Sequence, residues 1–527
     1  MATTFSRRSM LASCVGAGSV SLGACSGIGR VVPARAATVP LPDAAAIRRD
    51  YQAMVDFGPR LPGNANHKRY VASMASDFAK AGLNLIQSEE YPYTFWKPGD
   101  FGLKVGVGDV MQAVPDIAYY VRSASTGPDG VEGQLYYAGH FDPSTMEADL
   151  AAIPAGAIVV MDGRLPQMTI RKLVNLRYLQ ESGEDTDGYL DRPYKRLWLT
   201  PGFNVDRLRE AGAAGVIIIM DVSSDMIRNN FSPHSQSYKP PLPALFVGAD
   251  TGQRLREQPR QGQRARLTLD AEWVDGYCPQ ITALLPGRSD EVIIINTHTD
   301  GQNFIEENGC VAMLQLARHF ASLPWAERLT RTVVFAAWPG HMTGELPQCE
   351  GWMRAHPELV KRAVAAFTIE HLGAPEWEDV SDVGYAPTGR NEYMNFATTD
   401  GVLTQVVREG LQKYQLAQHG IEVAPGITTG AAFHASGIPH MGSICGPNYL
   451  LGIAENGHID KLDAELAAKQ TRMIAEIIKR VDRIKTCGRA TAPWEPIRWK
   501  ACRRAWLRPV RHLLPMRKFI LRSAPNE

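Results

Sequence analysis

The first residues that could carry chemistry follow an apolar run, Val292–Ile295. His298 and Asp300 come directly after this run, and Glu306 and Glu307 follow a few residues later. Imidazole and carboxylate groups are both zinc ligands, and a second carboxylate can orient a ligating imidazole. The segment therefore predicts the first half of a zinc site at the end of a buried strand. The alternative is an ordinary polar strand end followed by a solvated turn.

Two further apolar runs end in the same way. Residues 331–338 are followed by His341, and residues 364–369 are followed by Glu370. Between the first two runs, residues 310–322 have the i, i+3, i+4, i+7 spacing of an amphipathic helix. The resulting β-α-β-α-β order predicts a doubly wound α/β sheet, in which the ends of successive strands converge on one cleft.

These motifs resemble those of a known family, the zinc aminopeptidases and carboxypeptidases that include glutamate carboxypeptidase and, as a non-catalytic relative, the transferrin receptor. Residues 57–63 and 433–439 resemble the two ends of the catalytic domain of that family. Residues 132–136, 208–219 and 242–247 resemble a protease-associated domain, which is the usual insert. The resemblance implies a three-layer α/β/α zinc-exopeptidase-like domain interrupted by a β-rich protease-associated domain.

The resemblance and the composition together divide the chain into five segments. They are an export signal at 1–36, the first part of the peptidase-like domain at 42–110, the protease-associated insert at 111–272, the main part of the peptidase-like domain at 273–487, and a basic C-terminal tail at 488–527.

The resemblance also implies which residues hold metal. The family binds two zinc ions through five side chains. His298 matches the first of these ligands, with Asp300 as the carboxylate that orients it. Either Glu306 or Glu307 takes the place of the aspartate that bridges the two ions, and Glu370 takes the place of a second aspartate. These replacements keep the negative charge of the site.

Two positions depart from the family pattern. The adjacent glutamates of the family, which are a general base and a ligand, align with His341 and Met342, and the late histidine ligand falls near Ile453. Both missing ligands serve the same ion, so the sequence predicts a site reduced to one zinc ion. Three protein ligands with one open position are the normal arrangement of catalytic zinc. His341 then stands where the family keeps its general base, a role that suits histidine near neutral pH.

Three other histidines lie near the expected cleft. His371 directly follows Glu370, but neighbouring residues in an extended strand point to opposite faces, so the two are not expected to reach one ion. His434 could contact a substrate. His458 lies five residues beyond the expected late ligand, and its loop could bring it back to restore the second metal.

The N-terminus resembles a twin-arginine export signal of bacteria, because Arg7 and Arg8 precede a weakly apolar run. Residues 22–25 resemble a lipobox, which would leave Cys25 as a lipidated N-terminus, whereas residues 34–36 resemble an ordinary signal-peptidase site. Both versions predict an exported protein of the periplasm or cell surface. Beyond the signal the cysteines are scattered, which argues against a cysteine metal site and a dense disulfide framework but leaves room for one or two bridges.

Composition limits the partners. The chain of 527 residues is 45% hydrophobic, long enough for more than one domain, and its net charge of +1 gives no attraction to nucleic acid. No apolar span long enough to cross a membrane follows the signal. Residues 498–522 contain nine basic and no acidic residues, interleaved with Trp and Leu. This pattern favours contact with an anionic membrane surface, and a tail packed on the domain is the alternative.

The sequence therefore predicts an exported, metal-dependent peptidase. The resemblance supplies the reaction, which is hydrolysis of a peptide bond at a chain terminus, and the substrate is expected to be a peptide or a small molecule. The alternative is a non-catalytic binding protein with the same fold, because a fold does not fix a function.

Overall fold

A computed structural model describes residues 37–86, 89–140, 150–180, 186–231, 237–257, 262–381 and 383–484. The described residues from Thr38 onward belong to one compact unit. None of the helices in these ranges is both long enough and apolar enough to cross a membrane. The four cysteines of these ranges are buried and free: Cys278, Cys310, Cys349 and Cys445. The export signal with Cys25 and the basic tail lie outside the described residues.

The main sheet has nine strands, and its centre is parallel. The strand order is β1 (Asn84–Ile86), β11 (Ile281–Leu285), β13 (Arg331–Trp338), β12 (Ser289–His298), β14 (Ala363–Ile369), β19 (His440–Cys445), β17 (Met394–Thr398), β18 (His419–Glu422) and β7 (Leu176–Gln180). Strand β12 pairs in parallel with β13 on one side and with β14 on the other. The predicted β-α-β-α-β order is confirmed.

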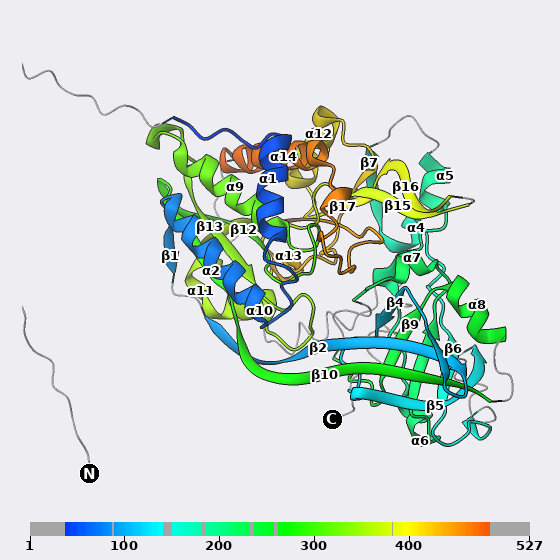
Figure 1. Cartoon of the computed structure of the whole chain (residues 1–527). Coiled ribbons are helices and arrows are strands. Elements are labelled where there is room, and N and C mark those ends of the chain that lie inside the picture. Colours follow the sequence, from blue (N-terminus) through cyan, green and yellow to red (C-terminus); the bar gives the residue numbers. More distant parts are fainter. Residues whose placement is uncertain are drawn as a thin grey trace, which may run out of the picture. The chain divides into compact units, whose positions relative to one another are not determined.

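Helices cover both faces of the main sheet (Figure 1). One layer consists of α1 (Ala44–Val55), α2 (Ala65–Lys80), α9 (Gly309–Ser322), α12 (Val402–Tyr414) and α14 (Ala464–Asp482), and the other of α10 (Gln348–Ala355), α11 (Pro357–Arg362) and α13 (Ala431–Ala435). Along β12, Ile293 and Ile295 pack into the first core, whereas Val292 and Ile294 pack into the second. This alternation is that of a strand buried on both faces. The predicted three-layer α/β/α architecture is confirmed.

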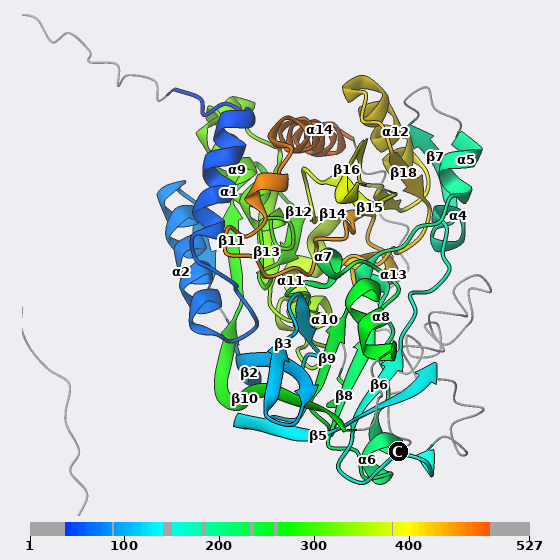
Figure 2. The same ribbon diagram turned by 45° about the vertical axis from the view of Figure 1, so that its right-hand side comes forward.

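A second sheet has eight strands and lies, in sequence, between the first part and the main part of the peptidase-like fold. Its order is β3 (Val110–Ala113), β2 (Glu90–Val107), β10 (Gln263–Pro279), β5 (Gly127–His140), β6 (Ile158–Asp162), β8 (Gly215–Ile219), β9 (Ala244–Val247) and β4 (Ile117–Tyr119). The long strands β2 and β10 pair antiparallel over almost their whole length (Figure 2). In the described part of this region, the sheet is accompanied by the short helices α6 (Asp206–Glu210), α7 (Ser224–Ile227) and α8 (Ala249–Glu257).

The second sheet occupies a longer stretch of sequence than the predicted insert at 111–272, because β2 starts at Glu90 and β10 ends at Pro279. A period-two pattern that runs across a domain boundary gives no local signal of where the boundary falls. The identification of this region as a protease-associated domain stays a prediction.

One segment of the predicted insert returns to the main sheet. It contains α4 (Ile170–Leu173), β7, α5 (Thr186–Asp191) and the 3-10 helix η1 (Leu197–Leu199), and β7 pairs with β18 at the edge of the main sheet. Arg196 of this segment is fully buried, and its guanidinium donates hydrogen bonds to Glu376 and Glu392 at 2.9 and 3.0 Å. Glu376 lies on the hairpin of β15 (Pro375–Val380) and β16 (Gly384–Asn391), so a buried ion pair joins the returning segment to the main fold.

A buried histidine of the main sheet makes the fold sensitive to acid. His419 is fully buried on β18, its Nδ1 lies 2.7 Å from the carbonyl oxygen of Ala417, and its Nε2 lies 2.8 Å from Nε2 of Gln470. Burial lowers the pKa of His419 from 6.5 to about 4. Between these values the unfolded chain binds a proton that the folded chain excludes, so stability is complete above the unfolded pKa and is lost as the pH falls toward 4.

We therefore expect the free energy of unfolding to fall by up to about 3 kcal/mol from this group alone as the pH is lowered from 6.5 to 4. In His419→Gln the fall should be smaller by that amount, because glutamine does not titrate. Urea unfolding at pH 7 and pH 4.5 measures both values. An identical pH dependence in the variant and the wild type would show that His419 does not contribute.

Candidate metal centre

The carboxyl ends of three neighbouring strands bring three histidines together. His298 is the last residue of β12, His341 follows the end of β13, and His371 follows the end of β14. One ligand nitrogen from each ring lies within 4.8 Å of the other two. His298 and His371 are buried, and the side chain of His341 is 14% exposed. We call His298, His341 and His371 the three-histidine cluster.

Two of these imidazoles are oriented by backbone carbonyl groups. The Nδ1 of His298 lies 2.9 Å from the carbonyl oxygen of Asp300, and the Nδ1 of His371 contacts the carbonyl oxygen of Cys445. A carbonyl oxygen only accepts, so Nδ1 is the donor in both rings, and Nε2 is the nitrogen that each ring can offer to a metal ion. This is how ligating histidines are usually held in metal sites.

The position of His371 differs from the expectation for an extended strand. Strand β14 ends at Ile369, and His371 has a left-handed backbone with φ of 59°. The rule that neighbouring residues point to opposite faces does not apply to such a turn. The turn directs the imidazole of His371 into the cluster, with its ring centroid 6.0 Å from that of His298.

The turn that carries His371 is held from several sides. The thiol of Cys445 donates to the carbonyl oxygen of His371 at 2.9 Å. The side chain of Asn308 clamps the next residue, since it donates to the carbonyl oxygen of Leu372 at 2.7 Å and accepts from its N–H at 2.9 Å. Asn308 also stands at the start of α9, two residues after Glu306. It therefore couples the position of His371 to that of Glu306.

Asp300 organises the loop that carries His341. Its carboxylate accepts hydrogen bonds from the backbone N–H groups of Gly340, His341 and Met342 at 2.8, 3.3 and 2.8 Å. Burial raises the pKa of Asp300, and the charge of His341 and these three hydrogen bonds act against that rise. The backbone carbonyl of Asp300, and not its carboxylate, makes the contact with His298.

The structure distinguishes the two adjacent glutamates. The Oε1 of Glu306 lies 2.9 Å from Nε2 of His341, and its Oε2 lies 3.8 Å from Nε2 of His371. Glu307 instead forms an ion pair with Arg60, which is fully buried. A side chain at Gly301 would overlap both glutamates, so only glycine fits there. Glu306 is therefore the member of the pair that faces the cluster.

Glu370 lies beside the cluster but is anchored elsewhere. Its Oε1 accepts from the backbone N–H and the hydroxyl of Thr429 at 2.8 and 2.7 Å. Burial alone would lower the pKa of His341, but the contact with Glu306, with help from the charges of Glu370 and Asp300, raises it to about 9. The surrounding carboxylates therefore favour positive charge at the cluster.

The two remaining candidate histidines lie outside the three-histidine cluster. His434, on α13, has its Nδ1 3.4 Å from the hydroxyl of Thr399. His458 packs near the ring of Tyr449, and burial lowers its pKa to about 4. The position of the late family ligand, Ile453, donates its N–H to the carbonyl oxygen of Asn229 from the second-sheet region.

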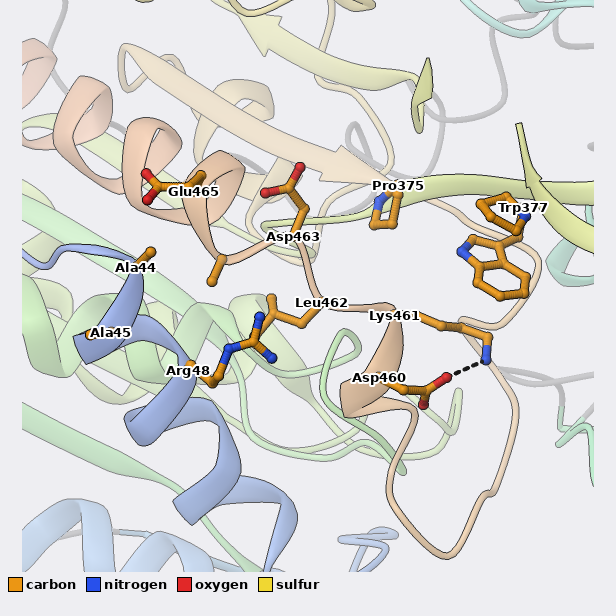
Figure 3. Close-up of a pocket in the computed structure, with 12 residues that line it drawn as sticks. Ala44, Ala45, Arg48, Pro375, Trp377, Asp460, Lys461, Leu462, Asp463 and Glu465 are labelled. Atoms are coloured by element: carbon orange, nitrogen blue, oxygen red, sulfur yellow. Dashed lines mark hydrogen bonds and ion pairs between the residues drawn. The ribbon is translucent and has the colours of Figure 1, made fainter. Parts of the chain in front are cut away.

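A separate pocket of about 660 Å³ lies between α1, the β15 strand and the 3-10 helix η3 (Ile459–Lys461) (Figure 3). In this pocket the ammonium group of Lys461 lies 4.5 Å from the centre of the Trp377 ring. None of the residues predicted for the metal site lines it.

The three-histidine cluster fits a divalent transition metal. It offers three imidazoles, two of which are oriented by carbonyl groups, and a carboxylate stands next to them. Imidazole nitrogens with a nearby carboxylate suit zinc and other transition metals, whereas magnesium and calcium bind mainly oxygen ligands. Of the predicted residues, His298, Glu306, His341 and His371 come together. Arg60, Asn308 and Thr429 position this site and were not predicted.

No family model and no curated protein matches the chain, but solved structures do. A Peptidase M28 precursor from Shewanella amazonensis is 17% identical, with a TM-score of 0.58, and the alignment covers 84% of this chain and 96% of that chain. The zinc aminopeptidase of Bacillus subtilis is 17% identical over 85% and 98% of the chains with a TM-score of 0.55. An aminopeptidase from Aneurinibacillus sp. is 17% identical over 84% and 94% with a TM-score of 0.52. The chain therefore has the fold of the zinc aminopeptidases.

The clamp on the His371 turn predicts a defect in metal binding. Asn308→Asp keeps an acceptor for the Leu372 N–H but loses the donor to its carbonyl, and the two oxygens then repel each other. We expect the affinity for zinc to fall by about 10-fold to 100-fold, the usual effect of a residue that holds a metal ligand. Competition with a chromophoric chelator measures the affinity.

Asn448→Asp is the matched control. Asn448 is also buried, accepts from the N–H of Leu197 at 3.2 Å and donates to the carbonyl oxygen of Trp377 at 3.0 Å, but it makes no contact with the cluster. Equal zinc affinities of the two variants would contradict the assignment of Asn308.

Proposed function

We propose that the protein is a metal-dependent hydrolase of peptide bonds that works with a single metal ion. The observation that carries this proposal is the three-histidine cluster at the carboxyl ends of β12, β13 and β14. In open α/β sheets this edge is where ligands bind. The fold shared with zinc aminopeptidases supports the choice of peptide substrates and of zinc.

The proposal of one ion rests on the positions that serve the second ion in the family. Met342 and Ile453 stand at two of these positions, and neither has a metal-binding side chain. Among the residues that the structure describes, the three-histidine cluster is the single group of three or more metal-binding side chains.

Zinc bound at this site would act as a Lewis acid and would lower the pKa of water. The chain supplies the rest of the chemistry. Carbonyl groups hold the rings of His298 and His371 in the required tautomer, and Asp300 fixes the backbone of His341. Glu306 provides a buried carboxylate in contact with the cluster, where it favours positive charge.

A non-catalytic binding protein is the second candidate. The observation that favours it is the replacement of the glutamate pair of the family by His341 and Met342, because the loss of a general base is typical of an abandoned active site. Metal content and turnover separate the two candidates.

We expect the protein purified without chelator to contain about one zinc ion per chain and to release amino acids from a panel of aminoacyl and peptidyl substrates. His298→Ala should remove both the metal and the activity, because it deletes a ligand. His434→Ala, a histidine outside the cluster, is the control and should keep the metal. Elemental analysis by mass spectrometry gives the stoichiometry. Two tightly bound ions would contradict the single-ion proposal, and a metal-free, inactive wild type would favour the binding protein.

We also propose that the protein is exported by the twin-arginine route and is anchored through a lipid on Cys25. The support is the order of Arg7 and Arg8, the apolar run and the lipobox-like residues 22–25. The basic tail at 488–527 would add membrane contact.

Cys25→Ala should move the protein from the membrane fraction to the soluble periplasmic fraction, because it removes the site of lipidation. Fractionation of cells followed by immunoblotting measures the distribution. A variant that lacks residues 488–527 is the control for the tail. If Cys25→Ala leaves the distribution unchanged, the lipid anchor is contradicted and cleavage after Ala36 is favoured.

A further inference from the structure

We infer that the metal centre is a three-histidine site, in which His298, His341 and His371 are the ligands and Glu306, rather than His341, accepts the proton during hydrolysis. The inference rests on the proposed function and deepens it. It changes the role of His341 from base to ligand, and it gives His371 a role that the sequence did not assign.

The placement of His341 relative to His298 supports its role as a ligand. The two rings are stacked, with centroids 4.1 Å apart and planes 28° apart. Asp300 fixes both residues, because its carbonyl group orients His298 and its carboxylate binds the backbone N–H of His341. Both rings therefore come from adjacent strand ends, and Asp300 contacts the ring of His298 and the backbone of His341. A ring nitrogen that binds an ion cannot also take up a proton, so the base must be another group.

The third ligand is supplied by a turn in the left-handed backbone conformation, with φ of 59° at His371. Among non-glycine residues, histidine is one of those that adopt this conformation more often than others. His371 is held in it by Cys445 and by the clamp of Asn308 on Leu372. The result is an Nε2 atom that faces Glu306 and the two other imidazoles.

The other carboxylates near the cluster make their hydrogen bonds and ion pairs outside it. The carboxylate of Asp300 accepts three backbone N–H groups, and Glu307 is paired with the buried Arg60. Glu370 is anchored through Oε1 by Thr429, and its buried Oε2 has no hydrogen-bond partner among the described residues. Glu306 is the carboxylate that contacts the imidazoles themselves, at 2.9 Å from His341. It is therefore the group placed to take a proton next to the proposed ligands.

The reaction balances as a hydrolysis. The oxygen of water forms a bond to the carbonyl carbon of the peptide, and one of its O–H bonds breaks as the proton passes to an oxygen of Glu306. The C–N bond then breaks, and the proton moves from Glu306 to the leaving nitrogen. The products are a carboxylic acid and an amine, and Glu306 returns to its initial charge.

Three variants test the assignment, each measured for bound zinc, for the absorption spectrum of the cobalt-substituted protein and for peptidase activity. His371→Asn suits the left-handed backbone and keeps a donor toward the Cys445 carbonyl, so the turn should fold. It should lower the zinc content at least tenfold. His341→Ala should also lose zinc. Glu306→Gln should keep zinc and the cobalt spectrum but lower kcat by about 10² to 10⁴, the usual contribution of a general base.

Each outcome separates this inference from the proposed function. A wild type without metal or peptidase activity overturns the proposed function itself. A metal-containing wild type whose zinc and cobalt spectrum survive in His371→Asn or His341→Ala overturns the three-histidine site. Loss of zinc in Glu306→Gln would make Glu306 a ligand, and an unchanged kcat would exclude it as the proton acceptor, so both results overturn its assigned role.

Discussion

The parallel pairing of β12 with β13 and β14 is the constraint on which the proposed centre depends. Parallel strands that are neighbours in a sheet have their carboxyl ends at the same edge. The residues at these ends are therefore close together in space, although they are far apart in the sequence. His298 is the last residue of β12, and His341 and His371 follow the ends of β13 and β14. The apolar alternation of β12 fixes the sheet between two helical layers, and this burial holds the three strand ends in place.

Two buried arginines form ion pairs with buried glutamates. Arg60 pairs with Glu307. Arg196, which lies in the segment that returns from the second-sheet region, pairs with Glu376 and Glu392 of the main fold. Removing one member of a buried pair typically costs 3 to 5 kcal/mol, because the other charge stays buried. The first pair keeps Glu307 away from the cluster. The second joins distant parts of the chain, so the stability of the centre depends on both regions.

Much of the architecture could be predicted from the sequence, because apolar periodicity and strand-end residues are local signals. The runs before His298, His341 and Glu370 predicted three adjacent strands, and the structure has them. The edge strand β7 was not predicted, since its pairing with β18 depends on residues more than two hundred positions away.

The site was harder to predict than the fold. Glu306 and Glu307 are adjacent and chemically equal, and only the distant Arg60 distinguishes them. His371 was set aside because an extended strand would have turned it away from Glu370, but the chain leaves the strand at Ile369. A left-handed turn at a histidine has no sequence signal of its own. Both outcomes were decided by tertiary contacts that a pattern along the chain does not contain.

The most direct test of the central claim is X-ray absorption spectroscopy at the zinc edge of the purified protein, combined with its zinc stoichiometry. About one zinc ion per chain, with a first shell that contains three imidazole nitrogens at roughly 2.0 to 2.1 Å, is the predicted result. A zinc–zinc pair, or a first shell made mainly of carboxylate oxygens with a single imidazole, would contradict it.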